Sequence, residues 1–168
     1  MTSRPNGLPT LSVSNLKGGA AKTVSSIVLT EVMALAGANV LLVDLDPQGT
    51  GSAWLAGRSE SATKLLTGGF DPGEDIDVAI GPPGLDSDQG TLDVLRPEDV
   101  GRVDMVTANR SLEDATERRT SDLSQRLEKL WRGAEGGYDV AVVDTPPQAG
   151  SLVTASFLST AGVLVPVA

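Results

Sequence analysis

The sequence predicts an α/β fold in which a mostly parallel sheet is covered by helices on both faces. Strand-length apolar runs alternate along the chain with segments of helical periodicity, which is the pattern of βαβ units with right-handed crossovers. The segments 39–44 and 138–144 each contain a continuous apolar run, as expected for parallel strands that are buried on both faces. The chain has 168 residues, 40% of them hydrophobic, which suits one domain with a sizeable core.

The first strand begins at Leu11 and leads into a turn of small residues that ends in Lys22-Thr23, where a helical pattern starts. Small residues let successive backbone N–H groups close on phosphate oxygens, a lysine reaches the outer phosphates, and a hydroxyl binds Mg²⁺. The dipole of the following helix attracts the same anion. The stretch therefore predicts a phosphate-binding loop, although Leu16 and Ala21 replace both glycines of the strict Walker pattern. The alternative is a glycine-rich turn that binds nothing.

The helix after this loop is predicted from apolar residues at helical spacing, and Gly37 supplies its C-terminal cap. We expect this helix to cover one face of the sheet; its apolar residues are Val24, Ile27, Val28, Val32 and Leu35. The next strand, 39–44, ends in Asp44, and Asp46 follows at i+2, so both carboxylates can point to one side. The alternative is a solvated strand end followed by a simple Asp46-Pro47 turn.

The middle of the chain carries weaker signals. A short helix is expected near Ser52, and we assign no chemistry to 59–89, where Gly81-Pro82-Pro83-Gly84 indicates an exposed loop. Two candidate strands follow, at 92–95 and 103–107. Ser111 and Asp114, three residues apart, predict a capping box that opens a polar helix.

The last third of the chain returns to clear α/β alternation. The strand 138–144 ends in Asp144, a small-residue helix is expected at 151–160, and a final strand at 162–167. Ligands of such folds bind at the carboxyl ends of the strands. Lys22, Asp46 and Asp144 all fall at those ends, so the sequence predicts that they meet.

Phosphoryl transfer asks a protein mainly for positioning and for charge that offsets the phosphates. Lys22 is expected to neutralise the β- and γ-phosphates, Thr23 to coordinate Mg²⁺, and Asp144 to act on the metal through water as a Walker B acid. The alternative for Asp144 is again a solvated strand end.

Composition excludes several classes of function. The net charge of −9 argues against a surface that grips DNA over its whole extent, although a small basic patch is compatible with it. The chain has no cysteine, which excludes disulfide scaffolds, thiolate zinc sites and iron–sulfur clusters, and no histidine, which removes the commonest general base. Residues 1–10 are predicted to form a flexible tail and lack the apolar core of a signal peptide, and no apolar run is long enough to span a membrane. We therefore expect a cytoplasmic protein without a membrane partner.

Three segments together resemble one protein family. Lys17-Gly18-Gly19-Ala20-Ala21-Lys22-Thr23 is similar to the deviant Walker A box of the ParA and MinD ATPases. Val43-Asp44-Leu45-Asp46-Pro47-Gln48-Gly49 resembles the Walker A′ segment of ParA-type (Soj-like) plasmid and chromosome partition ATPases. The segment 138–147 resembles their Walker B segment. The resemblance implies a three-layer P-loop NTPase fold over residues 11–168 that is incomplete at the C-terminus.

The same resemblance implies a set of roles. Asp46 is expected to orient the attacking water, with Lys17 acting across an ATP-bound homodimer and Lys22 completing the catalytic set. Thr23, Asp44 and Asp144 are the expected Mg²⁺ residues. The residues expected to hold ATP are Lys17, Gly18, Gly19, Ala20, Ala21, Lys22, Thr23 and Val24. If Ala21 occupies a position that needs positive φ, alanine there costs on the order of 1 kcal/mol or more.

The function implied is ATP-driven dimerisation that segregates plasmid or chromosomal DNA through a DNA-bound, ParB-like adaptor. Non-specific DNA binding is expected only from C-terminal residues that this chain does not contain. An alternative is a nucleotide-sensing or degenerate interaction module without ATP turnover, and a third is a metabolic ligase or synthetase on the same fold. The segment Asp46-Pro47-Gln48-Gly49 favours a partition protein over the synthetase.

Overall fold

The computed structural model describes residues 7–57, 59–80 and 100–167. They form a six-stranded sheet of order β3-β4-β2-β5-β1-β6, in which every neighbouring pair is parallel except β3 and β4. The strands are β1 (Thr10–Val13), β2 (Val40–Asp44), β3 (Asp77–Ile80), β4 (Val103–Val106), β5 (Val140–Asp144) and β6 (Gly162–Leu164). The helices are α1 (Lys22–Leu35), α2 (Thr50–Leu55), α3 (Ser61–Thr67), α4 (Pro72–Asp75), the 3-10 helix η2 (Arg110–Glu117), α5 (Thr120–Ala134) and α6 (Ser151–Ser159).

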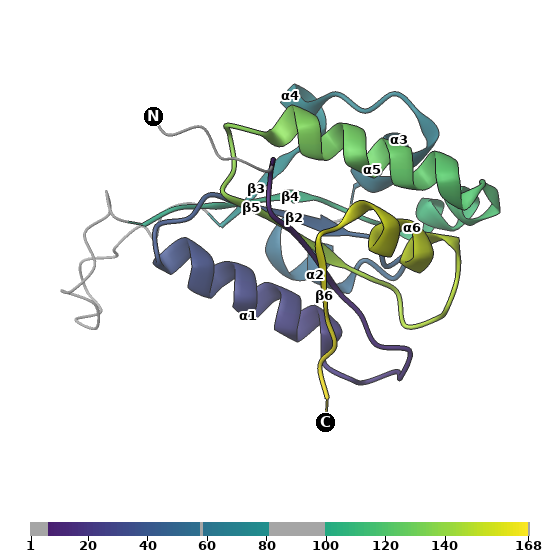
Figure 1. The fold of residues 1–168 in the computed structure, drawn as a ribbon, viewed down its shortest axis with the longest axis horizontal. Coiled ribbons are helices and arrows are strands. Elements are labelled where there is room, and N and C mark those ends of the chain that lie inside the picture. Colours follow the sequence, from purple (N-terminus) through teal and green to yellow (C-terminus); the bar gives the residue numbers. More distant parts are fainter. Residues whose placement is uncertain (1–6, 58, 81–99, 168) are drawn as a thin grey trace.

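Helices cover both faces of the sheet, which confirms the predicted fold class (Figure 1). The larger core lies on the face that carries α3, η2, α5 and α6, where side chains such as Leu41, Leu66 and Leu127 are buried. The smaller core lies under α1 and includes Leu42 and Met105. β2 is buried along its whole length because its valines and leucines alternate between these two cores.

Helix α1 covers the sheet as expected, but of the five apolar residues expected to face the sheet only Ile27 is buried. Val24, Val28, Val32 and Leu35 are exposed, whereas the buried residues are Lys22, Ser26, Ile27, Thr30 and Ala34. Small residues allow a helix to lie close to a sheet. The buried hydroxyls of Ser26 and Thr30 donate to carbonyls of the preceding turn, Ser26 to that of Lys22 at 3.1 Å and Thr30 to that of Ile27 at 2.8 Å. Helical periodicity alone does not tell which stripe faces inward.

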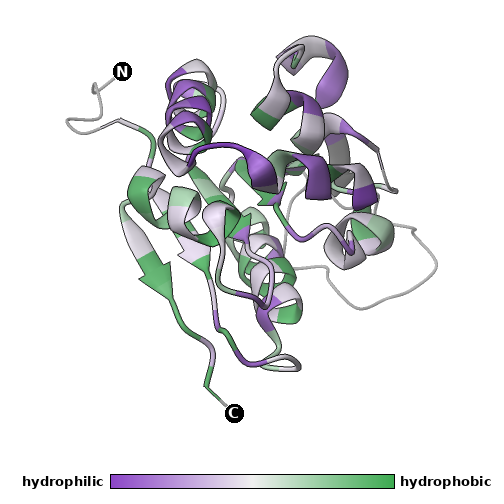
Figure 2. Ribbon diagram, turned by 90° about the vertical axis from the view of Figure 1, so that its right-hand side faces the viewer, coloured by the Kyte–Doolittle hydropathy of each residue, from purple (hydrophilic) through white to green (hydrophobic). Residues whose placement is uncertain are grey.

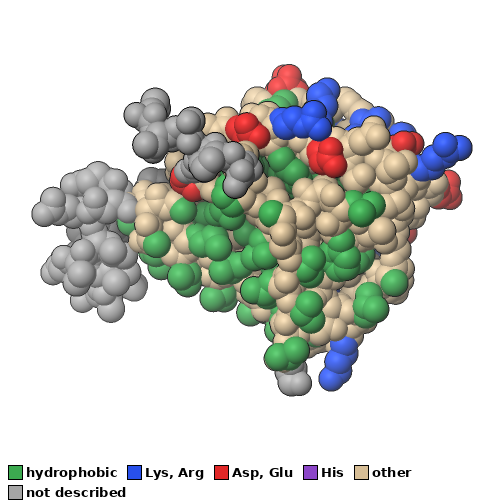
Figure 3. Space-filling model, viewed as in Figure 1, with side chains coloured by type: hydrophobic (Ala, Val, Ile, Leu, Met, Phe, Trp, Pro, Cys, Tyr) green, Lys and Arg blue, Asp and Glu red, His purple; other side chains and the backbone are tan. Residues whose placement is uncertain are grey.

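An apolar surface therefore remains open on one side of the molecule. Hydrophobic side chains spread over the part of Figure 3 where Figure 1 places α1 and β6, and charged side chains gather along the upper edge over α4 and α5. The segment that runs from β6 to the C-terminus is hydrophobic along most of its length (Figure 2), and Val163, Val165 and Val167 are exposed.

Local elements differ from the sequence predictions at several points. The segment 59–80, which gave weak periodicity, contains α3, α4 and the antiparallel strand β3. The polar helix begins two residues earlier than the predicted capping box, because the side chain of Asn109, not Ser111, caps η2 by accepting from the Ser111 N–H at 2.9 Å. The final strand ends at Leu164, before Pro166.

Other predictions hold or fall outside the described residues. The short helix near Ser52, the strand at 103–107 and the helix at 151–160 are confirmed as α2, β4 and α6, within a few residues at their ends. The candidate strand 92–95, the loop 81–84 and most of the N-terminal tail lie outside the described ranges. None of the helices described is long and apolar enough to cross a membrane.

Candidate nucleotide-binding site

The loop that joins β1 to α1 has the backbone of an anion-binding turn. Gly19 has φ 75°, and Ala21 has φ 57° and ψ 24°, in the left-handed region. Ala21 is the only non-glycine residue with positive φ in the described part of the chain. Because this region is unfavourable for a residue with a Cβ, the structure confirms that alanine at this position carries backbone strain.

The N-terminus of α1 faces this loop without a competing acceptor. Ala21 occupies the N-cap position and offers no side-chain cap, and the first turn of the 14-residue helix holds no acidic residue. A side chain added at Gly18 or Gly19 would meet no atom within 4 Å, so the space beside the loop is open. The unsatisfied N–H groups and the positive end of the helix dipole together suit a phosphate.

Lys22 is the first residue of α1 and the only cation in its first turn. Its side chain is only 7% exposed, yet it has no ion-pair or hydrogen-bond partner among the described residues. Burial of an unpaired ammonium group is costly. A ligand that carries negative charge would compensate this group.

Two carboxylates lie side by side at the carboxyl ends of the central strands. Asp44 at the end of β2 is directly opposite Asp144 at the end of β5, and both are almost fully buried. Burial, first, and the neighbouring Asp44 charge, second, raise the pKa of Asp144 to about 7. Burial also raises the pKa of Asp44, against the lowering effect of its hydrogen bonds. A buried like-charge pair of this kind is relieved by a cation.

Asp144 faces the first turns of α1. Its Oδ1 accepts a hydrogen bond from the Ser26 hydroxyl at 3.2 Å, and the hydroxyls of Thr23 and Ser26 both lower its pKa. Its Oδ2 is buried without any hydrogen-bond partner. A buried carboxylate oxygen with no donor, beside a threonine hydroxyl, is the donor set expected of a Mg²⁺ site. No three acidic side chains within residues 7–57, 59–80 and 100–167 are placed to hold a metal ion together, so water and phosphate oxygens would have to complete such a site.

Asp44 is held by hydrogen bonds within its own loop. Its Oδ1 accepts from the Asp46 N–H at 2.9 Å, and its Oδ2 accepts from the Ser52 N–H at 3.0 Å and the Ser52 hydroxyl at 2.7 Å. Ser52 is fully buried, and its hydroxyl also accepts from the Ala108 N–H at 2.8 Å. Gly51 packs closely against the side chains of Thr23 and Asp44, since a Cβ at this position would lie 3.3 Å from Thr23 and 3.4 Å from Asp44. Ser52 thus ties β2, α2 and the end of β4 together.

Sequence reasoning missed the part played by Ser52. It lies eight positions after Asp44 and in a different element, α2, so the periodicity of one element does not relate the two residues. The only available signal was its place in the short helix that follows the Asp44–Gly49 segment.

Asp46 lies at the same edge of the sheet, but one of its oxygens is used in a turn. Its Oδ1 accepts from the Gln48 N–H at 2.9 Å, as the turn alternative required. Asp46 and Gln48 also line a cavity of about 530 Å³, whose opposite wall is formed by Pro146, Pro147 and the start of α6. Asp46 therefore combines a local structural role with access to an open space.

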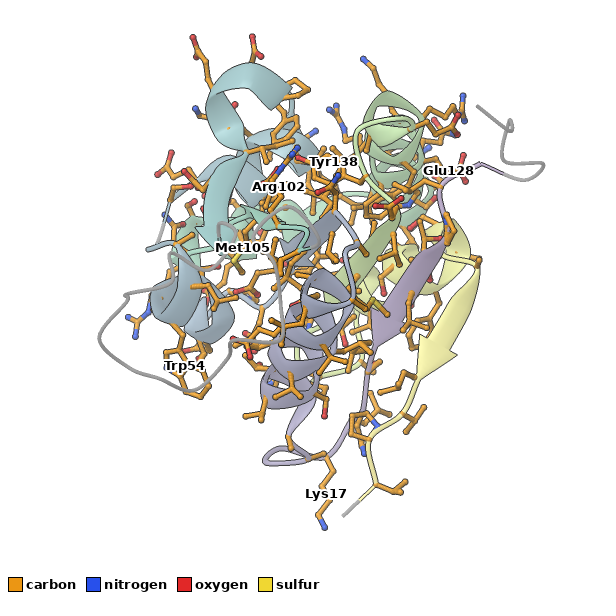
Figure 4. The ribbon with its side chains drawn as sticks, turned by 90° about the vertical axis from the view of Figure 1, so that its left-hand side faces the viewer. Lys17, Trp54, Arg102, Met105, Glu128 and Tyr138 are labelled. Atoms are coloured by element: carbon orange, nitrogen blue, oxygen red, sulfur yellow. The ribbon has the colours of Figure 1, made fainter. Side chains whose placement is uncertain are left out.

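Lys17 is the predicted site residue that the structure does not bring to the others. Its side chain is exposed and points away from the body of the molecule (Figure 4). Its backbone N–H donates to Asn15 Oδ1 at 2.8 Å, and Asn15 in turn donates to the Pro166 carbonyl at 2.8 Å. The remaining predicted residues, from Gly18 to Val24 together with Asp44, Asp46 and Asp144, lie in the loop, in the first turn of α1 and at the adjacent strand ends.

Comparison with known proteins agrees with this geometry. The family model described as AAA domain (AAA_31) matches residues 9–168. The chain is 33% identical over 165 residues to the chromosome partitioning protein ParA of Caulobacter vibrioides, covering 96% of this chain and 56% of that protein. It is 26% identical over 159 residues to the sporulation initiation inhibitor protein Soj of Bacillus subtilis, covering 94% of this chain and 57% of that protein. The chain thus spans about half the length of the curated relatives it matches.

Solved structures give the same fold. A cobyrinic acid a,c-diamide synthase from Mycobacterium smegmatis, with bound ATP analog and magnesium, is 27% identical and matches with a TM-score of 0.72 over 95% of this chain and 60% of that chain. A putative plasmid partition protein from Borrelia burgdorferi bound to AMPPNP, at 20% identity, has a TM-score of 0.67 over 96% of this chain and 63% of that chain, which supports the fold alone. The chain therefore belongs to the AAA_31 family, the P-loop ATPase family of the ParA and Soj partition proteins.

Proposed function

We propose that this chain binds Mg-ATP at the β1–α1 loop and hydrolyses it as a partition ATPase, dimerising on ATP to segregate plasmid or chromosomal DNA. The observation that carries the proposal is the pairing of Asp44 with Asp144 beside the first turn of α1. The pair leaves a buried carboxylate oxygen without a donor, and the first turn of α1, which the pair faces, also carries a buried lysine without an anion among the described residues. Mg-ATP supplies both of the missing charges.

The binding roles follow from this arrangement. The loop from Lys17 to Val24 holds the phosphates through its N–H groups, and the Lys22 ammonium neutralises the outer phosphates. Thr23 and Asp144 are the residues that would hold Mg²⁺. When bound, Mg²⁺ offsets the negative charge of the phosphates. Asp44 already accepts three hydrogen bonds. Its main role is therefore to add negative charge beside Mg²⁺ and to position the loop after β2, and not to bind the metal directly.

Hydrolysis requires an oriented water beside the γ-phosphate. The Asp46 oxygen that does not take part in the turn contact with Gln48 orients this water. Asp46 lines the open cavity at the strand ends, so a water can reach it there. The water oxygen forms a bond to the γ-phosphorus, the bond from that phosphorus to the bridging oxygen breaks, and ADP leaves while the proton ends on inorganic phosphate. Lys17, which points outward, is free to reach the nucleotide of a partner subunit.

The partners proposed are those of a partition system. They are a second copy of this chain in the ATP-bound state and a DNA-bound, ParB-like adaptor. Direct DNA binding is proposed only for residues beyond this chain, since the net charge of the chain is −9.

The test combines ATP binding with phosphate release. Titration of fluorescent ATP with Mg²⁺ should saturate with the parent chain and fail with Lys22→Ala. Asp46→Ala should still bind ATP but release no phosphate, while the matched control Asp122→Ala, changed on the exposed first turn of α5, should keep both activities. Unchanged turnover in Asp46→Ala would count against the assigned roles.

A second candidate is a nucleotide sensor without turnover. The observation in its favour is Ala21, whose left-handed backbone is strained and whose methyl group lies in the phosphate loop. This candidate predicts saturable ATP binding with no phosphate release from the parent chain. A metabolic synthetase on the same fold, the third candidate, would instead require an acceptor substrate before it turns over ATP.

A further inference from the structure

A second cavity lies on the face of the sheet that carries the larger core, between α5 and the segment that joins α3 to β3. Its volume is about 440 Å³, within the range of small-molecule sites. None of the residues proposed to bind nucleotide lines it. Its lining residues are Leu65, Gly68, Gly69, Phe70, Pro72, Ile76, Arg126, Lys129, Leu130, Gly133, Ala134 and Tyr138.

The floor of this cavity is apolar and fixed. Leu65, Leu130 and Ala134 are buried in the larger core, and Phe70 and Ile76 pack against it. Tyr138 adds an aromatic wall to the cavity, and two contacts hold its ring in position. Its hydroxyl donates to Asp104 Oδ2 at 2.9 Å, and the Arg102 guanidinium lies 5.7 Å from its ring centre (Figure 4). The cavity is therefore lined by side chains that the fold already holds in place.

One face of α5 brings positive charge to this apolar floor. Arg126, Lys129, Leu130 and Gly133 follow the i, i+3, i+4, i+7 spacing, so they lie along one side of the helix. Among the residues that the structure describes, neither Arg126 nor Lys129 has an ion-pair partner, and no acidic residue lines the cavity. The cavity is therefore locally positive, although the chain as a whole has a net charge of −9.

Glycines keep the hollow open. Gly68 and Gly69 have φ of 109° and 95°, and the Arg126 guanidinium lies 3.6 Å from the point where a side chain at Gly68 would start. Gly133 lies within α5, where glycine costs about 1 kcal/mol relative to alanine. A Cβ at Gly133 would meet no atom within 4 Å, so the space beside this residue is open.

We infer that this cavity binds a small amphipathic organic anion, with an apolar ring or short chain on the floor and a carboxylate or sulfonate against Arg126 and Lys129. The apolar floor supplies burial, and the two cations supply charge-assisted hydrogen bonds that select an anion. The inference does not depend on the proposed function of the β1–α1 loop.

The test uses 8-anilinonaphthalene-1-sulfonate, a fluorescent aromatic sulfonate, with the full chain. The parent should bind it saturably, and Arg126→Gln/Lys129→Gln should weaken binding by about tenfold or more, because charged hydrogen bonds are lost. Gly133→Leu should fill the hollow and abolish binding, whereas Gly133→Ala should retain it. Arg118→Gln, an exposed change in the loop before α5, is the matched charge control.

The exposed apolar stripe of α1 is another surface that can take up this dye. Val28→Asp/Val32→Asp changes that stripe and should leave the affinity unaltered. The inference is overturned if this variant loses the binding, or if Arg126→Gln/Lys129→Gln binds like the parent. The glutamine variants change only side chains at the surface, so they decide the question even if Gly133→Leu does not fold. Binding of an acidic peptide at the cavity without binding of the dye would also overturn it.

Discussion

Asp144 at the end of β5 lies directly opposite Asp44 at the end of β2, and both carboxyl groups are buried. Because neighbouring parallel strands place their carboxyl ends side by side, the sheet fixes the backbones of the two acids next to each other. Their mutual repulsion is thus a fixed property of the sheet, and it makes the stability of the chain depend on pH.

The first prediction concerns that dependence. Burial, first, and the Asp44 charge, second, raise the pKa of Asp144 to about 7 from its ordinary value of 3.8, so between those values the folded chain holds a proton that the unfolded chain has lost. The free energy of unfolding should therefore fall as the pH rises from about 4 to about 7 and then level off. Asp144→Asn should flatten this dependence and be more stable than the parent at about pH 8. Urea unfolding at several pH values checks it, with Asp122→Asn as the control; an identical pH profile for Asp144→Asn would contradict it.

The second prediction concerns the strained loop. Ala21→Gly should raise the free energy of unfolding by about 1 kcal/mol, because glycine adopts the left-handed region without cost. It should also tighten ATP binding by removing a methyl group from the phosphate loop. Thermal unfolding and ATP titration measure both effects. The control Ala53→Gly, on the exposed side of α2, should lower stability by about 0.5–1 kcal/mol. A loss of stability in both variants would show that Ala21 is not strained.

A third prediction concerns Ser52. Ser52→Ala leaves Asp44 and the Ala108 N–H each without one buried partner, which should cost about 1–3 kcal/mol. Loss of the Ser52 hydrogen bond should also raise the pKa of Asp44 further, since that bond lowers it. Chemical denaturation gives the first effect and the pH dependence of Mg-ATP binding the second. Ser121→Ala, an exposed change at the start of α5, should stay within about 0.5 kcal/mol of the parent. Equal free energies of unfolding for the two variants would show that Ser52 does not hold Asp44 in position.

A fourth prediction separates stability from binding at Lys22. Lys22→Met replaces a buried ammonium group that has no partner among the described residues by an apolar side chain of similar length. In the absence of nucleotide this variant should be at least as stable as the parent, because an unpaired charge no longer has to be buried. It should nevertheless fail to bind ATP. Lys17→Met, changed at an exposed side chain, should keep ATP binding by the monomer. A large loss of stability in Lys22→Met would indicate a structural and not a ligand-binding lysine.

The strong signals in the sequence placed most of the central sheet correctly. The apolar runs before Asp44 and Asp144 predict buried parallel strands because a strand buried on both faces has few other compositions available. The position of the β1–α1 loop followed from the change of periodicity at Lys22. The condition under which alanine at position 21 is costly, a positive φ, is met in the structure, where Ala21 has φ 57°.

What the sequence did not reveal depends on tertiary packing. The stripe of α1 that contains Val28 is apolar but exposed, because the sheet selects the small side chains of Ser26 and Thr30 for close approach. β3 is short and lies antiparallel at the sheet edge, so it lacks the pattern of a buried strand. The link from Asp44 through Ser52 to Ala108 joins residues far apart in the chain, and only the fold brings them together.

The unequal covering of the two sheet faces has a consequence for how the chain opens. Four helical segments shield the face that carries the larger core, whereas α1 with the short α2 shields the other. Amide hydrogens of α1 should therefore exchange with deuterium before those of β2 and β5, as one cooperative unit that detaches while the rest persists. Mass-spectrometric exchange resolved by peptide would detect this order, and bound nucleotide should slow the α1 peptides most.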